Sequence, residues 1–201
     1  ENFYQPDAYL SNRLYFSLFY MDSVNPISRQ LVWLSDDRGS SWQEIFYYPD
    51  QRMDITQTIL TSHPADSSLL YYLNSKTMWD KWLWISHDSG QQYDIVDFPV
   101  TGIQDPFIVK NSLLFHPQEP KRLYLAMDEG IFESNDWGYT WQHVGYFTGT
   151  ITWSPYFMIR MDPQDPDRLY AVHYDSLFRR NDSESEWINI DQGIPEELLY
   201  L

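Results

Sequence analysis

Acidic side chains are the most abundant groups in this sequence that could do chemistry. The chain has 29 Asp and Glu residues against 13 Lys and Arg residues, which gives a formal net charge of −16. Two carboxylates held across a cleft could hydrolyse a glycosidic bond, one as general acid and the other as base or nucleophile. With 20 Asp and 9 Glu in the chain, the sequence alone does not single out such a pair.

Metal chemistry has less support in the sequence. The five histidines form no metal-binding pattern, and His63 and His116 stand in equivalent contexts, each before a proline. The acidic runs Asp36–Asp37 and 162–167 lack the spacing of an EF-hand loop. The chain has no cysteine, which excludes disulfides, thiolate catalysis and Cys-based zinc sites within these residues. We therefore expect no metal and no other cofactor.

The negative charge also narrows the classes of partner. An acidic surface repels the phosphates of nucleic acids and the headgroups of anionic lipids. No apolar run approaches the roughly 20 residues that span a bilayer, so we expect no membrane insertion by this segment. Basic peptides, basic proteins and cations remain compatible with the charge. We expect a protein or peptide ligand, with a basic one favoured, and contact with remaining propeller blades or other protein chains.

The elements that position these side chains are expected to be strands. Aromatic residues make up 18% of the chain, with 16 Tyr, 11 Phe and 9 Trp. Such side chains suit half-buried strand surfaces. The sequence therefore predicts an all-β protein.

An eight-residue motif recurs four times and defines the repeat. Its copies start 51, 48 and 46 residues apart, within the period of a propeller blade. They are Ser35–Trp42, Ser86–Tyr93, Ser134–Trp141 and Arg180–Trp187. An apolar strand precedes each copy (31–34, 83–85, 130–132 and 176–178), and a His-Pro or Asp-Pro turn leads to a Leu-Tyr strand further upstream at 69–71, 123–125 and 169–171.

The motif has the chemistry of a tight turn between two antiparallel strands. Its glycine tolerates positive φ, its aspartate can bond to turn amides, and its final aromatic residue can pack beneath the hairpin. We expect the turns to be held by Ser35, Asp37, Gly39, Trp42, Ser86, Asp88, Gly90, Tyr93, Ser134, Asp136, Gly138, Trp141, Asp182 and Trp187.

The motif resembles the Asp-box, or BNR, repeat, whose pattern is Ser-x-Asp-x-Gly-x-Thr-Trp. The third copy matches every fixed position, and the first differs only at Ser41. The second copy ends in Gln92-Tyr93, and the fourth has Glu184 where glycine is expected. The arrangement is most similar to that of the sortilin (Vps10-domain) receptors, in which a His-Pro or Asp-Pro turn also leads to a Leu-Tyr strand.

The resemblance implies an all-β propeller of four-stranded antiparallel blades, with about four blades present as an arc of a larger ring. We expect blade units at residues 1–50, 51–99, 100–147 and 148–192, with 193–201 starting the next unit. The resemblance also implies a receptor-like, extracellular or luminal module of the secretory pathway that binds proteins or peptides without catalysis.

An enzyme of the same fold is the alternative that we keep open. Asp boxes also occur in sialidase-like and xyloglucanase-like glycoside hydrolases. A sialidase needs three clustered arginines, and only Arg160, which follows Met158-Ile159, stands in a faintly similar context. An ordinary ion pair on an inner strand is the commoner role for such an arginine. We expect no catalytic residue in this chain.

Three residues are candidates for contact with a ligand or partner. The second unit is longer than the third, with 23 positions from His63 to Ser86 against 18 from His116 to Ser134. The extra residues form a Trp-rich tip, on which Trp79 and Trp82 could anchor an interface. Packing of Trp82 into a neighbouring blade is the equal alternative. Arg160 is the third candidate, because its predicted strand could face the channel.

Overall fold

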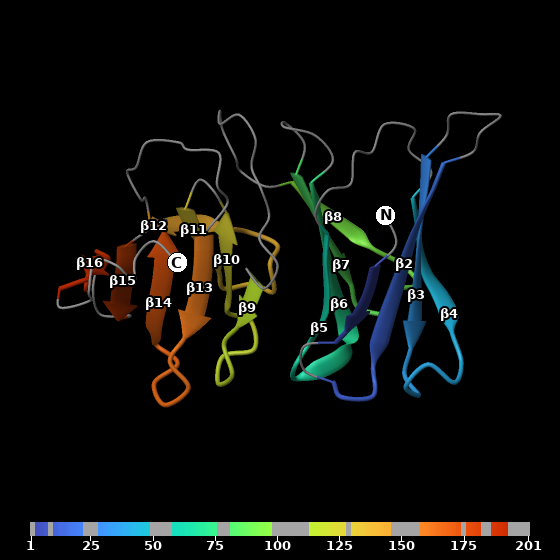
Figure 1. Ribbon diagram of the computed structural model, residues 1–201, viewed down its shortest axis with the longest axis horizontal. Coiled ribbons are helices and arrows are strands. Elements are labelled where there is room, and N and C mark those ends of the chain that lie inside the picture. The colour runs from blue at the N-terminus through green and yellow to red at the C-terminus, as the bar shows by residue number, and fades with distance from the viewer. Residues whose placement is uncertain are drawn as a thin grey trace. The chain divides into compact units, whose positions relative to one another are not determined.

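The computed structural model describes residues 3–7, 10–21, 28–48, 58–75, 81–97, 113–127, 130–145, 157–173, 176–181 and 186–192. All regular structure within these ranges is β-strand, in four antiparallel sheets of four strands each (Figure 1). This confirms the predicted all-β class and the four-stranded antiparallel sheets of a partial β-propeller. The described residues contain no helix long and apolar enough to cross a membrane.

The chain divides into two compact units, and residues 1–98 form the first. Its first sheet consists of β1 (Phe3–Pro6), β2 (Leu14–Met21), β3 (Ser28–Ser35) and β4 (Gln43–Tyr48). Its second sheet consists of β5 (Thr58–His63), β6 (Asp66–Ser75), β7 (Lys81–Ser86) and β8 (Asp94–Asp97). In both sheets each strand pairs with the strand before it in sequence.

Residues 99–201 form the second unit. Its third sheet consists of β9 (Leu113–Phe115), β10 (Leu123–Met127), β11 (Gly130–Ser134) and β12 (Gln142–Gly145). Its fourth sheet consists of β13 (Phe157–Met161), β14 (Arg168–His173), β15 (Ser176–Asn181) and β16 (Ile188–Asn189). Both sheets again follow chain order.

Strand register gives the four sheets a common set of positions. The first residue of each motif pairs with a leucine on the second strand of its sheet: Leu14 with Ser35, Leu70 with Ser86, Leu123 with Ser134 and Leu169 with Arg180. A tyrosine follows each leucine (Tyr15, Tyr71, Tyr124 and Tyr170). Because successive side chains alternate between faces, we call the face with this tyrosine the forward face and the other the backward face.

The core of the first unit lies between its two sheets. Tyr15, Val32 and Leu34 on the forward face of the first sheet form one buried cluster with Leu70 and Tyr72 on the backward face of the second. Burial of each such side chain contributes roughly 1.5–3 kcal/mol. Large side chains on both faces therefore join the two sheets.

The core of the second unit follows the same rule with smaller side chains. Tyr124 and Ala126 on the forward face of the third sheet cluster with Ile159, Leu169 and Ala171 on the backward face of the fourth. In each unit, therefore, a forward face packs on the backward face of the next sheet.

A β-bulge adds one residue to this packing in the first and third sheets. Register shifts between Val32 and Trp33 of β3, and at the equivalent place in β11. The unpaired residues on the partner strands are Ile45 and Val144, and each packs in the core of its unit. A bulge re-aims the side chain of its extra residue, which here points toward the neighbouring sheet.

Candidate functional site

The first three motif copies fold as turns with one shared hydrogen-bond pattern, and we call them box turns. The hydroxyl of the initial serine donates to the aspartate Oδ1 at 2.8–2.9 Å and accepts from the glycine amide at 2.8 Å. The same Oδ1 accepts from the amide four residues after the aspartate, in Ser41, Gln92 or Thr140. Each aspartate therefore closes the turn in which it lies.

Two consecutive residues of each box turn have positive φ. The glycines Gly39, Gly90 and Gly138 have φ of 89°, 89° and 91°. The residues before them are not glycine but also have positive φ: Arg38 (60°), Ser89 (60°) and Trp137 (67°). Sequence reasoning missed this second position, because an arginine or tryptophan gives no sign of a left-handed conformation.

The residue before the glycine, which has positive φ, joins the box turn to another turn of the same sheet. This other turn, which we call the first turn, joins the first two strands of the sheet. Its described residues lie at Asp7 and 10–13, or within 63–69, 116–122 or 162–168. The amides of Arg38, Ser89 and Trp137 donate to its carbonyls, those of Asn12, Ser68 and Lys121, at 3.0, 2.9 and 3.1 Å. In the first three sheets the two turns at this end are thus one bonded structure.

Electrostatics supports a structural role for the box aspartates. The Ser41 hydroxyl and amide, with the Ser35 hydroxyl, lower the pKa of Asp37 to about 2. The Gln92 amide has the leading lowering effect on the pKa of Asp88. A general acid needs a raised pKa, so these carboxylates have the opposite property.

Desolvation works against ionisation of Asp136, but hydrogen bonds from the hydroxyl and amide of Thr140 outweigh it and lower the pKa. All three described box aspartates are therefore committed to turn donors. Asp182, the fourth, lies outside the described residues. Trp187 of the fourth motif contacts the neighbouring sheet, where its Nε1 donates to the Val144 carbonyl at 3.1 Å.

The final aromatic residue of the first motif does not pack as the sequence predicts. Trp42 does not pack into a core but is exposed, and its ring lies edge-on to Phe16 at a centroid distance of 6.4 Å. Tyr93, its equivalent in the second sheet, is half-buried against the core of the first unit. Trp42 lacks such cover because no sheet packs on that side of the first sheet among the described residues.

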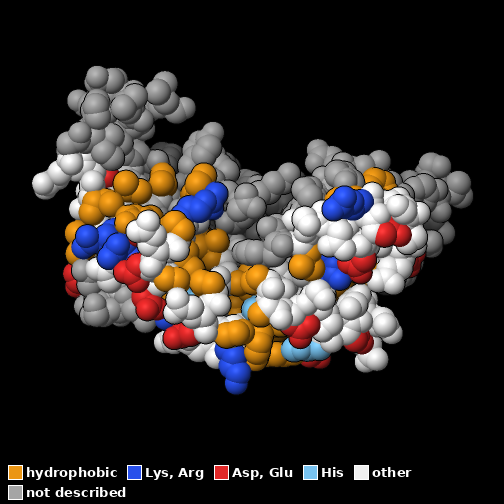
Figure 2. All heavy atoms as spheres, turned by 90° about the horizontal axis from the view of Figure 1, so that it is seen from below, with side chains coloured by type: hydrophobic (Ala, Val, Ile, Leu, Met, Phe, Trp, Pro, Cys, Tyr) orange, Lys and Arg blue, Asp and Glu red, His pale blue; other side chains and the backbone are white. Residues whose placement is uncertain are grey.

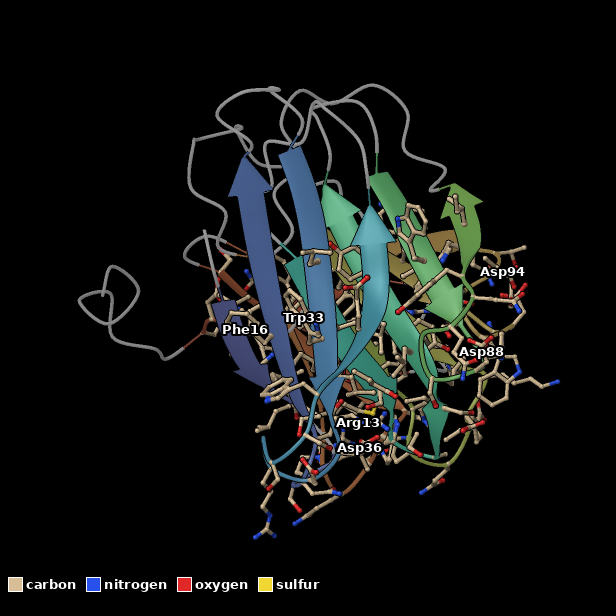
Figure 3. All side chains as sticks on the ribbon, turned by 90° about the vertical axis from the view of Figure 1, so that its right-hand side faces the viewer. Arg13, Phe16, Trp33, Asp36, Asp88 and Asp94 are labelled. Atoms are coloured by element: carbon tan, nitrogen blue, oxygen red, sulfur yellow. The ribbon has the colours of Figure 1, made fainter. Side chains whose placement is uncertain are left out.

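An arginine that sequence reasoning did not single out joins the two sheets of the first unit. Arg13 ends the first turn and is buried, and its Nε donates to Asp36 Oδ1 at 2.6 Å (Figure 3). Its Nη1 donates to Ser62 Oγ at 3.1 Å and to the Ser67 carbonyl at 2.5 Å, both in the second sheet. An arginine before the Leu-Tyr pair recurs in three of the four units, a signal that could have revealed it.

The equivalent arginine joins the two sheets of the second unit by ion pairs. Arg122 Nε donates to Glu133 Oε1 at 2.8 Å within the third sheet, and its Nη1 lies 3.4 Å from Asp167 Oδ1 of the fourth. Figure 2 shows acidic, basic and histidine side chains interspersed with hydrophobic ones on the face seen from below. Among the described residues, Arg13 and Arg122 thus each pair with acidic side chains of their own unit.

Of the three predicted contact residues, only Arg160 has a described side chain. Trp79 lies outside the described residues. Trp82 lies in β7, where its backbone pairs with Asn74 and Asp97, and its side chain is not described. Arg160 lies in β13, is exposed, and donates from Nη1 to the Ile159 carbonyl at 2.8 Å.

Arg160 lies on the forward face of the fourth sheet, which differs from the other forward faces. Tyr15 and Tyr124 are 0% and 1% exposed, whereas their equivalent Tyr170 is only half-buried. Met158 and Val172 pair across β13 and β14 on this face and are 44% and 37% exposed. This face keeps the apolar character of a packed face but is open among the described residues.

The backward face of the first sheet is open in the same way. Phe16 and Trp33 lie next to each other on β2 and β3 with ring centroids 5.8 Å apart (Figure 3). Both are half-buried, whereas Tyr72, the equivalent of Phe16 in the second sheet, is fully buried. The described sheets thus present two open faces, one aromatic and one that carries Arg160.

Comparison with protein families finds a match over most of the chain. Residues 30–197 match the model of the Sortilin-Vps10 family, described as sortilin, neurotensin receptor 3. No curated protein sequence matches the chain.

Solved structures with similar folds include two glycoside hydrolases and one other protein. The GH74 xyloglucanase from Xanthomonas campestris is 16% identical, with a TM-score of 0.59 over 96% of this chain and 30% of its own. An ancestral GH74 enzyme is 11% identical, with a TM-score of 0.62 over 96% of this chain and 31% of its own. YCF48 from Cyanidioschyzon merolae is 11% identical, with a TM-score of 0.52 over 94% of this chain and 55% of its own.

At these identities the likeness to solved structures shows the fold alone. The chain spans about a third of the length of the two GH74 enzymes and about half of YCF48.

Proposed function

This chain belongs to the sortilin-Vps10 family, and from that premise we propose that it is a non-catalytic propeller module that binds a protein or peptide ligand. We propose further that it is part of a receptor or larger assembly outside the cell or in the lumen of the secretory pathway. The observation that carries the proposal is the family match, which covers residues 30–197.

The chemistry of the box turns supports a role without catalysis. The carboxylates of Asp37, Asp88 and Asp136 accept hydrogen bonds from their own turns. Their pKa values are lowered, so they stay ionised at neutral pH. The most regular acidic residues of the sequence thus stabilise the fold.

The open forward face of the fourth sheet supports contact with other protein. Met158 and Val172 expose apolar surface there beside Arg160. On the same face of the third sheet, Tyr124 and Ala126, the equivalents of Tyr170 and Val172, are covered by the next sheet. We therefore assign to this face the packing of further propeller blades or of another protein chain.

The net charge favours a basic peptide as the ligand. At −16 the chain attracts cationic segments, and such attraction raises association rates and weakens with salt. The test is fluorescence anisotropy of the full chain with a labelled Lys-rich peptide and a Glu-rich peptide of equal length. We expect saturable binding of the Lys-rich peptide only, with an affinity that falls as salt rises. Equal binding of both peptides, or of neither, would contradict a basic ligand.

Substitutions on the open face test the assignment of that face. The double variant Met158→Ser and Val172→Ser should leave folding intact, because both side chains are exposed. It should weaken association with whatever protein covers the face, such as the remainder of the full-length protein. The control is Ile95→Ser, which removes an exposed apolar side chain from β8 in the other unit. Equal effects of both variants would show that the face has no special role.

A glycoside hydrolase is the competing function, favoured by the fold likeness to two GH74 enzymes. It is tested by incubating the full-length protein with xyloglucan and with a sialoside, and by measuring released reducing sugar or sialic acid. Release that depends on the protein would replace the non-catalytic proposal.

A further inference from the structure

The residue that begins each first turn also caps it, and its chemistry differs among the sheets. In the first and fourth sheets it is an aspartate: Asp7 Oδ1 accepts from the Leu10 amide, and Asp162 Oδ1 from the Gln164 amide, both at 2.9 Å. In the second and third sheets it is a histidine. His63 Nδ1 accepts from the Ala65 amide at 3.1 Å.

The histidine cap of the third sheet is buried and accepts from two amides. His116 is only 2% exposed, and its Nδ1 accepts from the amides of Gln118 and Glu119 at 3.3 and 3.0 Å. A ring nitrogen that accepts hydrogen bonds carries no proton, so the neutral imidazole holds its proton on Nε2. That atom lies 3.3 Å from Asp167 Oδ1 of the fourth sheet.

We propose that the His116 turn is a pH-sensitive clamp between the third and fourth sheets. A proton taken up from solvent at Nδ1 replaces the lone pair that accepts the two amides, and the turn at 116–122 opens. The equivalent turn at 162–168 has a carboxylate cap and stays closed in the same pH range, because a carboxylate is still ionised where histidine becomes charged.

The charged groups around His116 decide whether its protonation opens the turn or stabilises it. Asp167 attracts an imidazolium, but it is 52% exposed and is shared with Arg122, whose Nη1 lies 3.4 Å from the same oxygen. Arg122 also pairs with Glu133 and lies 3.5 Å from Glu119. An exposed, shared carboxylate stabilises a new cation weakly, because solvent screens the pair.

The opposing effects are stronger because they act at the buried ring itself. A proton on Nδ1 faces the amide hydrogens of Gln118 and Glu119, so both amides lose their acceptor and regain hydrogen bonds only when the turn opens and water reaches them. Arg122, whose Nη1 lies 3.4 Å from the same Asp167 oxygen, also opposes a further positive charge there. Protonation therefore favours the open turn.

Opening of this turn affects both sheets of the unit. The Lys121 carbonyl accepts from the Trp137 amide at 3.1 Å, so the turn holds the third box turn in place. Arg122 at its end reaches Asp167 in the fourth sheet. Loss of the His116 cap thus loosens the box turn and the contact with the fourth sheet together.

The test is hydrogen exchange of the full chain at about pH 7.5 and about pH 5, on either side of the ordinary histidine pKa. We expect the protection of the Gln118 and Glu119 amides, corrected for intrinsic exchange, to fall about tenfold relative to the Gln164 amide. Equal protection ratios at the two pH values would overturn the proposal.

Matched variants identify the group responsible. His116→Asp installs the cap found at Asp7 and Asp162, and it should abolish the acid-induced loss of protection at residues 118–119. His63→Asp makes the same change in the second sheet and should leave that loss unaltered. If His116→Asp keeps the acid response, another group causes it and the proposal fails.

A measurement on the unmodified chain covers the case in which His116→Asp does not fold. Nitrogen NMR of the histidine rings should show the His116 proton on Nε2 at neutral pH, and the Glu119 amide shift should titrate with the ring. A neutral ring protonated at Nδ1, or a Glu119 amide that ignores the titration, would contradict the clamp.

Discussion

The junction between the two sheets of the first unit and the junction in the second unit use the same repeat positions with different chemistry. In the first unit the buried Asp7 carboxylate accepts from the Tyr15 hydroxyl at 2.7 Å and from the Ser62 amide at 3.0 Å, and it also bonds to the Ser62 hydroxyl. Arg13 joins the same serine. This junction is a closed network under large side chains.

In the second unit the junction relies on ion pairs and on smaller packed side chains. Arg122 and His116 meet at Asp167, and Arg180 Nη1 lies 3.9 Å from Glu133 Oε2. The packed positions are smaller, with Ala126 and Ala171 in the cluster. The comparison teaches that one repeat frame tolerates a buried network around Asp7 and Arg13 at one junction, and at the other ion pairs that extend from the buried Arg122 to the exposed Asp167.

Removal of the two junction carboxylates should give the largest difference between the units. Asp7→Ala leaves the buried Ser62 amide without an acceptor and removes the acceptor that the Tyr15 and Ser62 hydroxyls share, so it should cost about 3 kcal/mol of unfolding free energy. Asp167→Ala removes a half-exposed partner and should cost less than about 1 kcal/mol. Urea denaturation of both variants at low and high salt measures this. A salt-dependent cost for Asp7→Ala, or a large cost for Asp167→Ala, would reverse the comparison.

A methyl group at Gly145 should disturb the second junction by an intermediate amount. A Cβ there would lie 2.4 Å from Trp187 Nε1, closer than atoms can approach, and the equivalent residue in the first sheet is Phe46. We expect Gly145→Ala to cost about 1–3 kcal/mol through overpacking. Thermal unfolding is the measurement. Adding Trp187→Leu to Gly145→Ala should recover part of the lost stability. If it recovers none, the contact with Trp187 is not the cause of the loss.

The smallest expected effect is the opening of the first box turn by acid. It should occur at lower pH than the opening of the His116 turn. The folded pKa of Asp37 is about 2, against an ordinary value of 3.8, so its stabilising contribution is full above about pH 4 and is lost as pH falls toward 2. The Ser41 amide shift should follow this titration by NMR. A midpoint at the ordinary aspartate value, or one unchanged in Asp37→Asn, would contradict the assigned hydrogen bonds.

The turns were predictable from sequence because their chemistry is local. Ser35, Asp37 and Gly39 bond within five residues, so their spacing alone specifies the turn. The strands followed from the same reasoning, since apolar runs flank each motif. Sequence pattern therefore predicted the four-stranded antiparallel sheets.

The junctions were not predictable, because they depend on how the sheets stack. The Arg13 and Asp7 contacts with Ser62 span 49 and 55 residues. Whether the position of Tyr15 or Tyr170 is buried depends on a neighbouring sheet and not on the tyrosine itself. The Arg160 candidate illustrates the same limit, since the strand could be predicted but the openness of its face could not.

The bulges in the first and third sheets bear on how the repeat can change in length. Loss of one residue from a regular strand turns every later side chain to the opposite face. The second sheet has no bulge between β7 and β8, where Leu83 pairs with Val96 and Trp84 with Ile95. A unit can thus gain or lose a residue at the place of Ile45 and Val144 and keep its strand register elsewhere. Units of unequal length can therefore still pack a forward face on the backward face of the next sheet.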